Sequence, residues 1–338
     1  MTHRWPVVAV LIVLQASMAL AASASSSAAA AQNEPGRQRS FLFSYGATIT
    51  GLAPGQVARV WLPVPQSSAD QMIEIVEQDL PVKGQVGKEM KWGNQLLYFQ
   101  APARQDGTLP MRVVYRVTRH EVAEQTPLAG TDSPDAEYLK ADALVPVGGK
   151  PLELLANKTL PDDQMQLGRL LYDVVNGHMQ YRKDKPGWGR GDAVWACDSG
   201  FGNCTDFHSL FISLARSNKM PAKFEIGFPL PEKRGEGDIA GYHCWGKFKP
   251  TGHGWVPVDI SEANKNPAKR EYFFGHLDEN RVTFSTGRDL ILAPKQDGPP
   301  VNFLIYPYVE VDGKPYDSAK VQRKITFKDE MPTTQPTR

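Results

Sequence analysis

A cysteine, a histidine and an aspartate occur in three short segments that follow one another along the chain. The segments are Gly202-Asn203-Cys204-Thr205-Asp206, Tyr242-His243-Cys244-Trp245 and Gly254-Trp255-Val256-Pro257-Val258-Asp259. A thiolate can attack a carbonyl carbon, an imidazole can move the protons, and a carboxylate can hold the imidazole in the productive tautomer. The order therefore predicts a triad of Cys204, His243 and Asp259.

The residues around Cys204 predict a helix that begins at the thiol. Asn203 is a favourable N-cap, and Asp206 three residues later can complete a capping box. The positive end of the helix dipole and its unpaired N–H groups would stabilise a thiolate or an oxyanion. The alternative is a cysteine that is simply buried, since cysteine is among the commonest core residues. The glycine-led, capped position favours the reactive interpretation.

His243 falls in a strand-like run, where its neighbours Tyr242 and Cys244 point to the opposite face. Trp245 lies on the same face as His243 and could form a wall of the site. His208, four residues after Cys204 on the same predicted helix, is the rival base. Its place one turn along the helix indicates a surface or packing role instead.

Asp259 closes a predicted strand from Trp255 to Ile260. It alternates with Val258 and Ile260, so its carboxylate would face away from their apolar side and toward an imidazole. The alternative is a strand-end or turn aspartate, because aspartate is depleted in strands except at turns, partners or sites.

The elements that must position these residues fall into a β-rich part and a mixed part. Residues 40–120 hold short alternating runs separated by turn residues, which predicts an antiparallel β-sandwich. Residues 121–160 are irregular and read as a linker docked on the core. A helix should begin after Asp162 and Asp163, and the thiol helix follows. Residues 161–338 are assigned to this mixed domain, with a C-terminal β extension.

The ends and composition of the chain indicate an exported protein. Residues 1–22 have the features of a secretory signal peptide, 23–39 read as a disordered leader, and no later run is apolar enough to span a membrane. With 38 Lys plus Arg against 37 Asp plus Glu, no charge excess favours nucleic acid. We expect no nucleic-acid partner and no membrane span in the mature chain.

The three cysteines leave alternatives open. An odd number in an oxidising compartment leaves at least one thiol free or paired between chains. A Cys197–Cys244 disulfide would leave Cys204 free, but pairing cannot be read from sequence. A zinc site built from Cys197, Cys204, His243 and Cys244 is disfavoured because the cysteine spacing is unlike that of zinc sites. We expect no metal and no cofactor.

These segments resemble the transglutaminase-like superfamily of bacterial proteins. That family carries a Gly-x-Cys-x-Asp helix start, a Pro-Ala-Arg helix end, a His-x-Trp strand and a Gly-Trp-x-x-x-Asp strand. Here the order and spacing match over about Leu160 to Glu262, with Lys223 in place of the usual arginine. The resemblance implies an α+β, papain-like core in which a thiol helix packs on an antiparallel sheet, preceded by a β-sandwich.

The same resemblance implies roles for the candidate residues. Cys204 would be the nucleophile, His243 the base and acid, and Asp259 the orienting carboxylate. Trp195, Asn203 and Trp245 are the candidates for substrate or oxyanion contacts. The implied function is an exported cysteine-dependent amide hydrolase or acyltransferase that forms a thioester and acts on a peptide or protein amide. The alternative is a non-catalytic periplasmic module that binds a protein or glycan.

Overall fold

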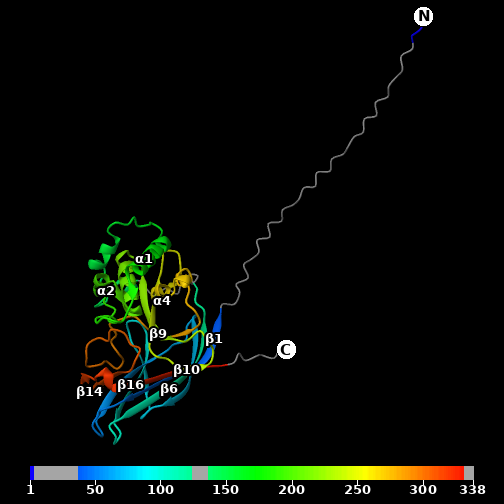
Figure 1. The fold of residues 1–338 in the computed structure, drawn as a ribbon. Helices are drawn as coiled ribbons and strands as arrows, with labels where there is room; N and C mark the ends of the chain where they lie inside the picture. Colours follow the sequence, from blue (N-terminus) through cyan, green and yellow to red (C-terminus); the bar gives the residue numbers. More distant parts are fainter. Residues whose placement is uncertain (4–36, 124–135, 331–338) are drawn as a thin grey trace. The chain divides into compact units, whose positions relative to one another are not determined.

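The computed structural model describes residues 1–3, 37–123 and 136–330 (Figure 1). The predicted leader lies outside the described residues up to residue 36, as does the predicted signal peptide apart from its first three residues. Residues Gly36–Arg338 form one compact unit, and every helix and strand of the described chain belongs to it.

Ten strands form two antiparallel sheets of five strands each (Figure 1). The strand orders are β10-β16-β1-β6-β3 and β15-β14-β2-β5-β4. Their bounds are β1 Gln38–Ile49, β2 Val57–Val64, β3 Gln71–Asp79, β4 Gln85–Lys88, β5 Gln95–Pro102, β6 Leu109–His120, β10 Glu236–Asp238, β14 Tyr308–Val311, β15 Lys314–Pro315 and β16 Val321–Asp329. Strands from both ends of the chain therefore complete the sandwich.

A third sheet of four strands, in the order β12-β11-β9-β13, belongs to the mixed part of the chain. Its strands are β9 Ala222–Pro229, β11 His243–Phe248, β12 Val256–Val258 and β13 Arg281–Thr286. The helices are α1 Gln164–His178, α2 Ala193–Ser199, α3 Cys204–Ser217 and α4 Ile260–Lys265. Short elements complete the list: β7 Gln180–Tyr181, β8 Phe201–Gly202, and the 3-10 turns η1 Glu137–Leu139, η2 Lys150–Leu155, η3 Pro267–Lys269 and η4 Ser318–Lys320.

Strand alternation explains how the sandwich meets this third sheet. Phe41, Phe43 and Tyr45 on β1 are all buried, as the period of two predicts. The ring of Phe43 lies 5.3 Å from that of Phe228 on β9 and 5.4 Å from that of Phe284 on β13. One continuous apolar core therefore supports the strands that carry the candidate site.

The structure confirms the mixed α+β class and the predicted helix starts. Asp163 caps α1 by accepting a hydrogen bond from the Gln166 N–H, and α3 begins at Cys204. One element differs: β12 ends at Val258, and Asp259 is the N-cap of α4 rather than a strand residue. The strand prediction extended too far because an aspartate after an apolar run is equally suited to begin a helix. The predicted domain boundaries stay a prediction.

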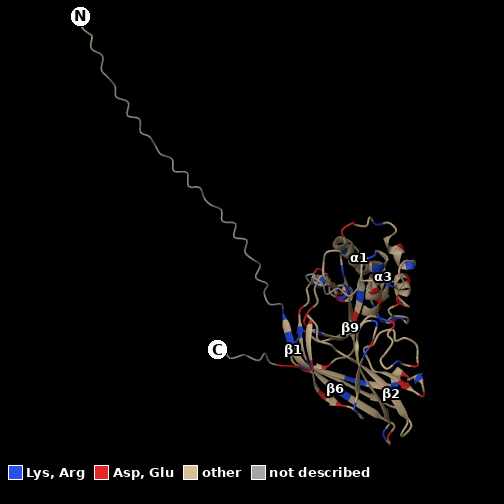
Figure 2. Cartoon of the chain, turned by 180° about the vertical axis from the view of Figure 1, so that it is seen from behind, with Lys and Arg blue, Asp and Glu red and all other residues tan. Residues whose placement is uncertain are grey.

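Charged residues of both signs are spread over the strands and helices in the view of Figure 2. Within the described residues, no helix has the length and apolar character needed to cross a membrane.

Candidate active site

Cys204 begins helix α3, and hydrogen bonds among its neighbours order this first turn. Asn203 Oδ1 accepts from the Thr205 N–H at 2.9 Å, and Asp206 Oδ2 accepts from the Asn203 N–H at 3.0 Å, which completes the predicted capping box. Asp206 also accepts from the Gly189 N–H at 2.7 Å. The cap therefore orders both the helix start and the loop before it. The Cys204 residue itself is 2% exposed.

A buried arginine ties that loop to the helix. Arg288 Nη1 donates to the Gly191 carbonyl at 2.6 Å and to Ser209 Oγ of α3 at 2.5 Å. Its Nη2 donates to the Arg190 carbonyl at 2.9 Å. Gly191 has a φ of +64°, and a Cβ there would lie 2.7 Å from Arg288 Nη1, so the close approach requires glycine. The sequence assigned no role to Arg288.

The structure brings Cys204, His243 and Asp259 together. His243 is the first residue of β11, and its Nε2 lies 2.7 Å from Asp259 Oδ2. The Cys204 side chain lies close enough to the imidazole that the two groups shift each other's pKa values. All three side chains are buried.

Four donors hold the Asp259 carboxylate. Oδ2 accepts from His243 Nε2 and, at 2.9 Å, from Arg281 Nη1. Oδ1 accepts from Ser261 Oγ and from the Glu262 N–H, both at 3.1 Å. Because Asp259 caps α4, the positive end of that helix adds to the favourable field. Two donors to each oxygen therefore fix the orientation of the carboxylate and favour its ionised form.

The three triad groups shift one another's pKa values. Burial alone would raise the pKa of Asp259, but the His243 imidazole and the Arg281 guanidinium hold it well below its usual value. Burial would lower the pKa of His243, but Asp259 and the Cys204 sulfur raise it to about 10. Burial would raise the pKa of Cys204, but hydrogen bonds from Cys244 and His243 hold it well below the ordinary thiol value. The arrangement favours a thiolate beside an imidazolium.

His208, the rival base, is fully buried and engaged at both ring nitrogens. Its Nδ1 lies 2.8 Å from the Cys204 carbonyl, and its Nε2 accepts from the Ile260 N–H at 3.1 Å. Burial lowers its pKa to about 4, so the ring is neutral and its Nδ1 carries the proton. The predicted packing role therefore fits the contacts, although the side chain lies inside the molecule and not at its surface.

The two neighbours of His243 contact the first turn of α3. Asn203 Nδ2 donates to the Tyr242 hydroxyl at 3.1 Å, and that hydroxyl lies 3.1 Å from Thr205 Oγ1. Cys244 Sγ lies 3.9 Å from Thr205 Oγ1 and 3.8 Å from His208 Nδ1. Tyr242, immediately before β11, and Cys244 on β11 thus both contact residues that flank the thiol, which the sequence did not predict.

All three cysteines are free thiols, so the Cys197–Cys244 disulfide considered from the sequence is absent. Cys197 is on α2, where its Sγ lies 3.7 Å from the Lys150 carbonyl, while Cys244 lies against α3. Among the residues that the structure describes, no group of three or more His, Cys, Asp or Glu side chains has an arrangement suited to a metal ion.

The two candidate tryptophans take different places. Trp195 lies on α2, with its ring edge-on to Phe201 at 5.2 Å, and a Cβ on Gly187 would lie 2.8 Å from it. These contacts connect Trp195 to the loop before α3. Trp245 is fully buried, with its ring 6.0 Å from the His243 ring and its Nε1 donating to Glu225 Oε2 at 2.8 Å. Trp245 therefore supports the imidazole from inside the protein.

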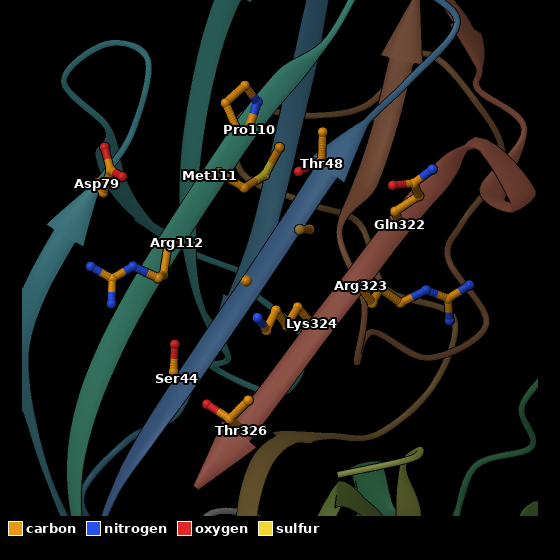
Figure 3. A pocket seen from close by; sticks show the side chains of 12 residues that line it. Ser44, Thr48, Asp79, Pro110, Met111, Arg112, Gln322, Arg323, Lys324 and Thr326 are labelled. Carbon is orange, nitrogen blue, oxygen red and sulfur yellow. The ribbon is translucent and has the colours of Figure 1, made fainter. Parts of the chain in front are cut away.

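Two pockets differ in their relation to the triad. One of about 190 Å³ adjoins it and is lined by His243, Glu262, Arg281 and neighbouring residues. Another of about 640 Å³ lies over β1, β6 and β16, where Arg112 and Lys324 flank it (Figure 3). The second pocket has no cysteine or histidine in its lining, so it holds neither a thiol nor an imidazole.

Arg281 is the main member of the site that sequence reasoning left out. It follows Asp259 by 22 positions, and no motif joins the two residues. The available signal was an arginine at the start of an apolar strand, since a buried arginine is rare unless it is paired.

Comparisons with known proteins relate part of this chain to one family. Residues 155–260 match the family model of the transglutaminase-like superfamily. An uncharacterized protein of Haemophilus influenzae is 27% identical over 324 residues, which cover 82% of this chain and 87% of that protein. The crystal structure of a candidate cysteine protease from Cytophaga hutchinsonii has a TM-score of 0.53 and 16% identity, over 86% of this chain and 99% of that one.

A more distant structure is the periplasmic domain of TgpA from Pseudomonas aeruginosa. It has a TM-score of 0.38 and 15% identity, over 70% of this chain and 93% of that one. That likeness is too weak to support a conclusion. Residues 155–260 therefore match a transglutaminase-like core, as the motifs indicated, and the chain shares its fold with the Cytophaga protein.

Proposed function

We propose that this protein is an exported, cysteine-dependent amide hydrolase or acyltransferase that acts through the triad of Cys204, His243 and Asp259. The observation that supports this proposal is the His243 imidazole, whose Nε2 lies 2.7 Å from Asp259 Oδ2 and which holds the pKa of the neighbouring Cys204 thiol below its usual value. The predicted signal peptide supports export.

The chemistry follows from the protonation states. The Cys204 thiolate adds to the carbonyl carbon of an amide, and the oxyanion is stabilised by N–H groups at the start of α3. The His243 imidazolium then gives its proton to the leaving amine, and the C–N bond breaks to leave a thioester. Water or a second amine, deprotonated by the now neutral imidazole, releases the acyl group as an acid or a new amide. Asp259 stays ionised throughout and orients the ring.

The first test is the rate of alkylation of each cysteine by iodoacetamide against pH, measured by peptide mass spectrometry. We expect Cys204 to react well below pH 8, and to react about tenfold or more slowly at pH 6 when His243 is changed to Ala, because the imidazolium stabilises the thiolate. Cys197 is an internal control, since burial raises the pKa of its thiol. Slow reaction of Cys204, unchanged in His243→Ala, would reject the proposed mechanism.

One observation favours the non-catalytic alternative: Cys204 is 2% and His243 5% exposed, so the site is nearly closed. A binding module that keeps the fold needs no open path to the thiol. The alkylation experiment separates the two functions, because a closed site also protects Cys204 from iodoacetamide at every pH.

A further inference from the structure

Arg281 joins the buried Asp259 carboxylate to the half-buried carboxylate of Asp278. Its Nη1 donates to Asp259 Oδ2 at 2.9 Å, and its Nε and Nη2 donate to the two oxygens of Asp278 at 3.2 Å. The guanidinium lies over the Trp245 ring at 4.9 Å. The Arg281 side chain is 3% exposed, so its hydrogen bonds are made to protein groups and compete little with water.

The shared oxygen gives Arg281 a geometric effect on the imidazole. His243 Nε2 and Arg281 Nη1 converge on Asp259 Oδ2, while the backbone and hydroxyl donors of α4 occupy Oδ1. A planar guanidinium with its other edge locked on Asp278 has one direction in which to donate. That direction determines where Oδ2 lies, and therefore how the imidazole faces Cys204.

The positioning effect of Arg281 can be distinguished from the effect of its charge, because Asp278 neutralises that charge. Arg281 and Asp278 form a neutral pair, so together they add no net charge near the imidazolium. The other titratable groups that face the triad carboxylate are His243, His208 at 3.8 Å, Tyr172, Tyr181, Cys244 and Glu262, which lies 3.6 Å from His243 Nε2 and is paired with Lys265. Removing the Arg281–Asp278 pair as a unit leaves all of these in place.

We infer that Arg281 is a positioning residue of the triad: held by Asp278, it fixes the Asp259 carboxylate so that the His243 imidazole stays aligned with the Cys204 sulfur. This inference rests on the proposed function and adds a fourth residue to the machinery. Arg281 acts through Asp259 and does not touch the reacting atoms. Arg281 also lines the pocket of about 190 Å³ beside His243.

The test is the charge-conserving double variant Arg281→Met with Asp278→Asn in the full chain. We expect Cys204 alkylation by iodoacetamide at pH 6 to fall about 10- to 100-fold, since loss of alignment of this kind costs that much in organised sites. The acid limb of the pH–rate profile should move upward, because a misaligned imidazolium stabilises the thiolate less. Asp278→Asn alone keeps Arg281 on Asp259 and should show a smaller shift in the same direction.

The matched control is Arg216→Met with Asp142→Asn. That pair is also buried, with Arg216 Nη1 2.6 Å from Asp142 Oδ2, and Arg216 lies on α3 roughly 18 Å along the helix from Cys204. It should lower the melting temperature and leave the acid limb of Cys204 where it is. A merely structural role for Arg281 predicts the same result for both double variants.

The outcomes separate the inference from the proposed function. Slow wild-type alkylation would reject the proposed function itself. Fast wild-type alkylation with an unchanged acid limb in Arg281→Met with Asp278→Asn would overturn only the role of Arg281. If that double variant does not fold, Arg281→Lys decides. Its ammonium keeps the charge but has no planar fork to bind Asp278 and Asp259 in a fixed direction, so alkylation at pH 6 should still be slowed, and a wild-type rate would overturn the inference.

Discussion

Strand β11 contributes one residue to each of two clusters of charged side chains: His243 to one and Lys247, four residues later, to the other. The two clusters differ in how their charges affect the pKa values within them. The triad cluster is Cys204, His243, Asp259 and Arg281. The second charge cluster is Asp70, Lys223, Glu225 and Lys247, in which Lys247 Nζ lies 2.5 Å from Asp70 Oδ2 and 3.5 Å from Glu225 Oε1. Trp245 separates them, since its Nε1 donates to Glu225 while its ring faces His243.

The pKa values of the two clusters show the difference. In the second charge cluster, burial would raise the pKa of Glu225, but Lys247 and Lys223 lower it to about 2, so the carboxylate stays ionised at all ordinary pH values. In the triad cluster, the pKa of Cys204 is lowered and that of His243 is raised, which places the proton on the imidazole and leaves the sulfur as a thiolate. Both clusters place charged side chains away from water. Of the two, the triad cluster is the one that pairs a nucleophile with a base.

The largest effect should come from removing the nucleophile. We expect Cys204→Ala to slow acylation by p-nitrophenyl acetate at least about 10⁴-fold, since loss of a triad nucleophile has effects of this size. The release of nitrophenolate is measured in rapid mixing, with the melting temperature as the control for folding. A variant that keeps the wild-type burst would place the reactive group elsewhere in the chain.

Lys247→Met changes the second charge cluster alone. We expect it to lower the free energy of unfolding by about 3–5 kcal/mol, because it leaves Asp70 and Glu225 buried beside one cation fewer. Denaturant unfolding gives this value. The acid limb of Cys204 alkylation should not move, and a clear shift would show that the two clusters are coupled through Trp245.

The neutral His208 should make stability depend on pH. Its pKa is about 4 in the folded chain against an ordinary 6.5, so the unfolded chain binds the extra proton first and stability falls as pH drops below 6.5. The full loss for this group down to pH 4 is about 3 kcal/mol. Denaturant unfolding at pH 6.5 and pH 5 should show the fall in wild type and a flatter response in His208→Asn, whose amide can donate without titrating. An equal slope in both would assign the effect to other groups.

The smallest effect should come from the helix cap. Asn203→Ala removes the acceptor for the Thr205 N–H and the donor to Tyr242. We expect a loss of about 1 kcal/mol in the free energy of unfolding. Asn203→Asp keeps the acceptor and should retain most of the stability, which thermal melting can compare. A loss equal to that of Lys247→Met would mean that the Tyr242 contact matters more than the cap.

Local sequence was enough to predict the parts of the site that depend on neighbouring residues. The capping box of Asn203 and Asp206 is such a feature, because a helix start is decided within one turn. The alternation that buries Phe41, Phe43 and Tyr45 is another, because side chains alternate along any strand. The Cys204, His243 and Asp259 motifs were readable for the same reason: each marks its own short element.

Only the tertiary structure decided which distant groups meet. Arg281 reaches Asp259 across 22 positions, and Arg288 reaches Ser209 across 79, through contacts that no periodicity records. The neutral state of His208 likewise depends on its burial in the folded chain, where its Nε2 accepts from the Ile260 N–H of another element. Sequence pattern determines which face of an element is buried and which residues can react. The folded chain determines which charges share that buried space, and with it the pKa values on which the proposed chemistry depends.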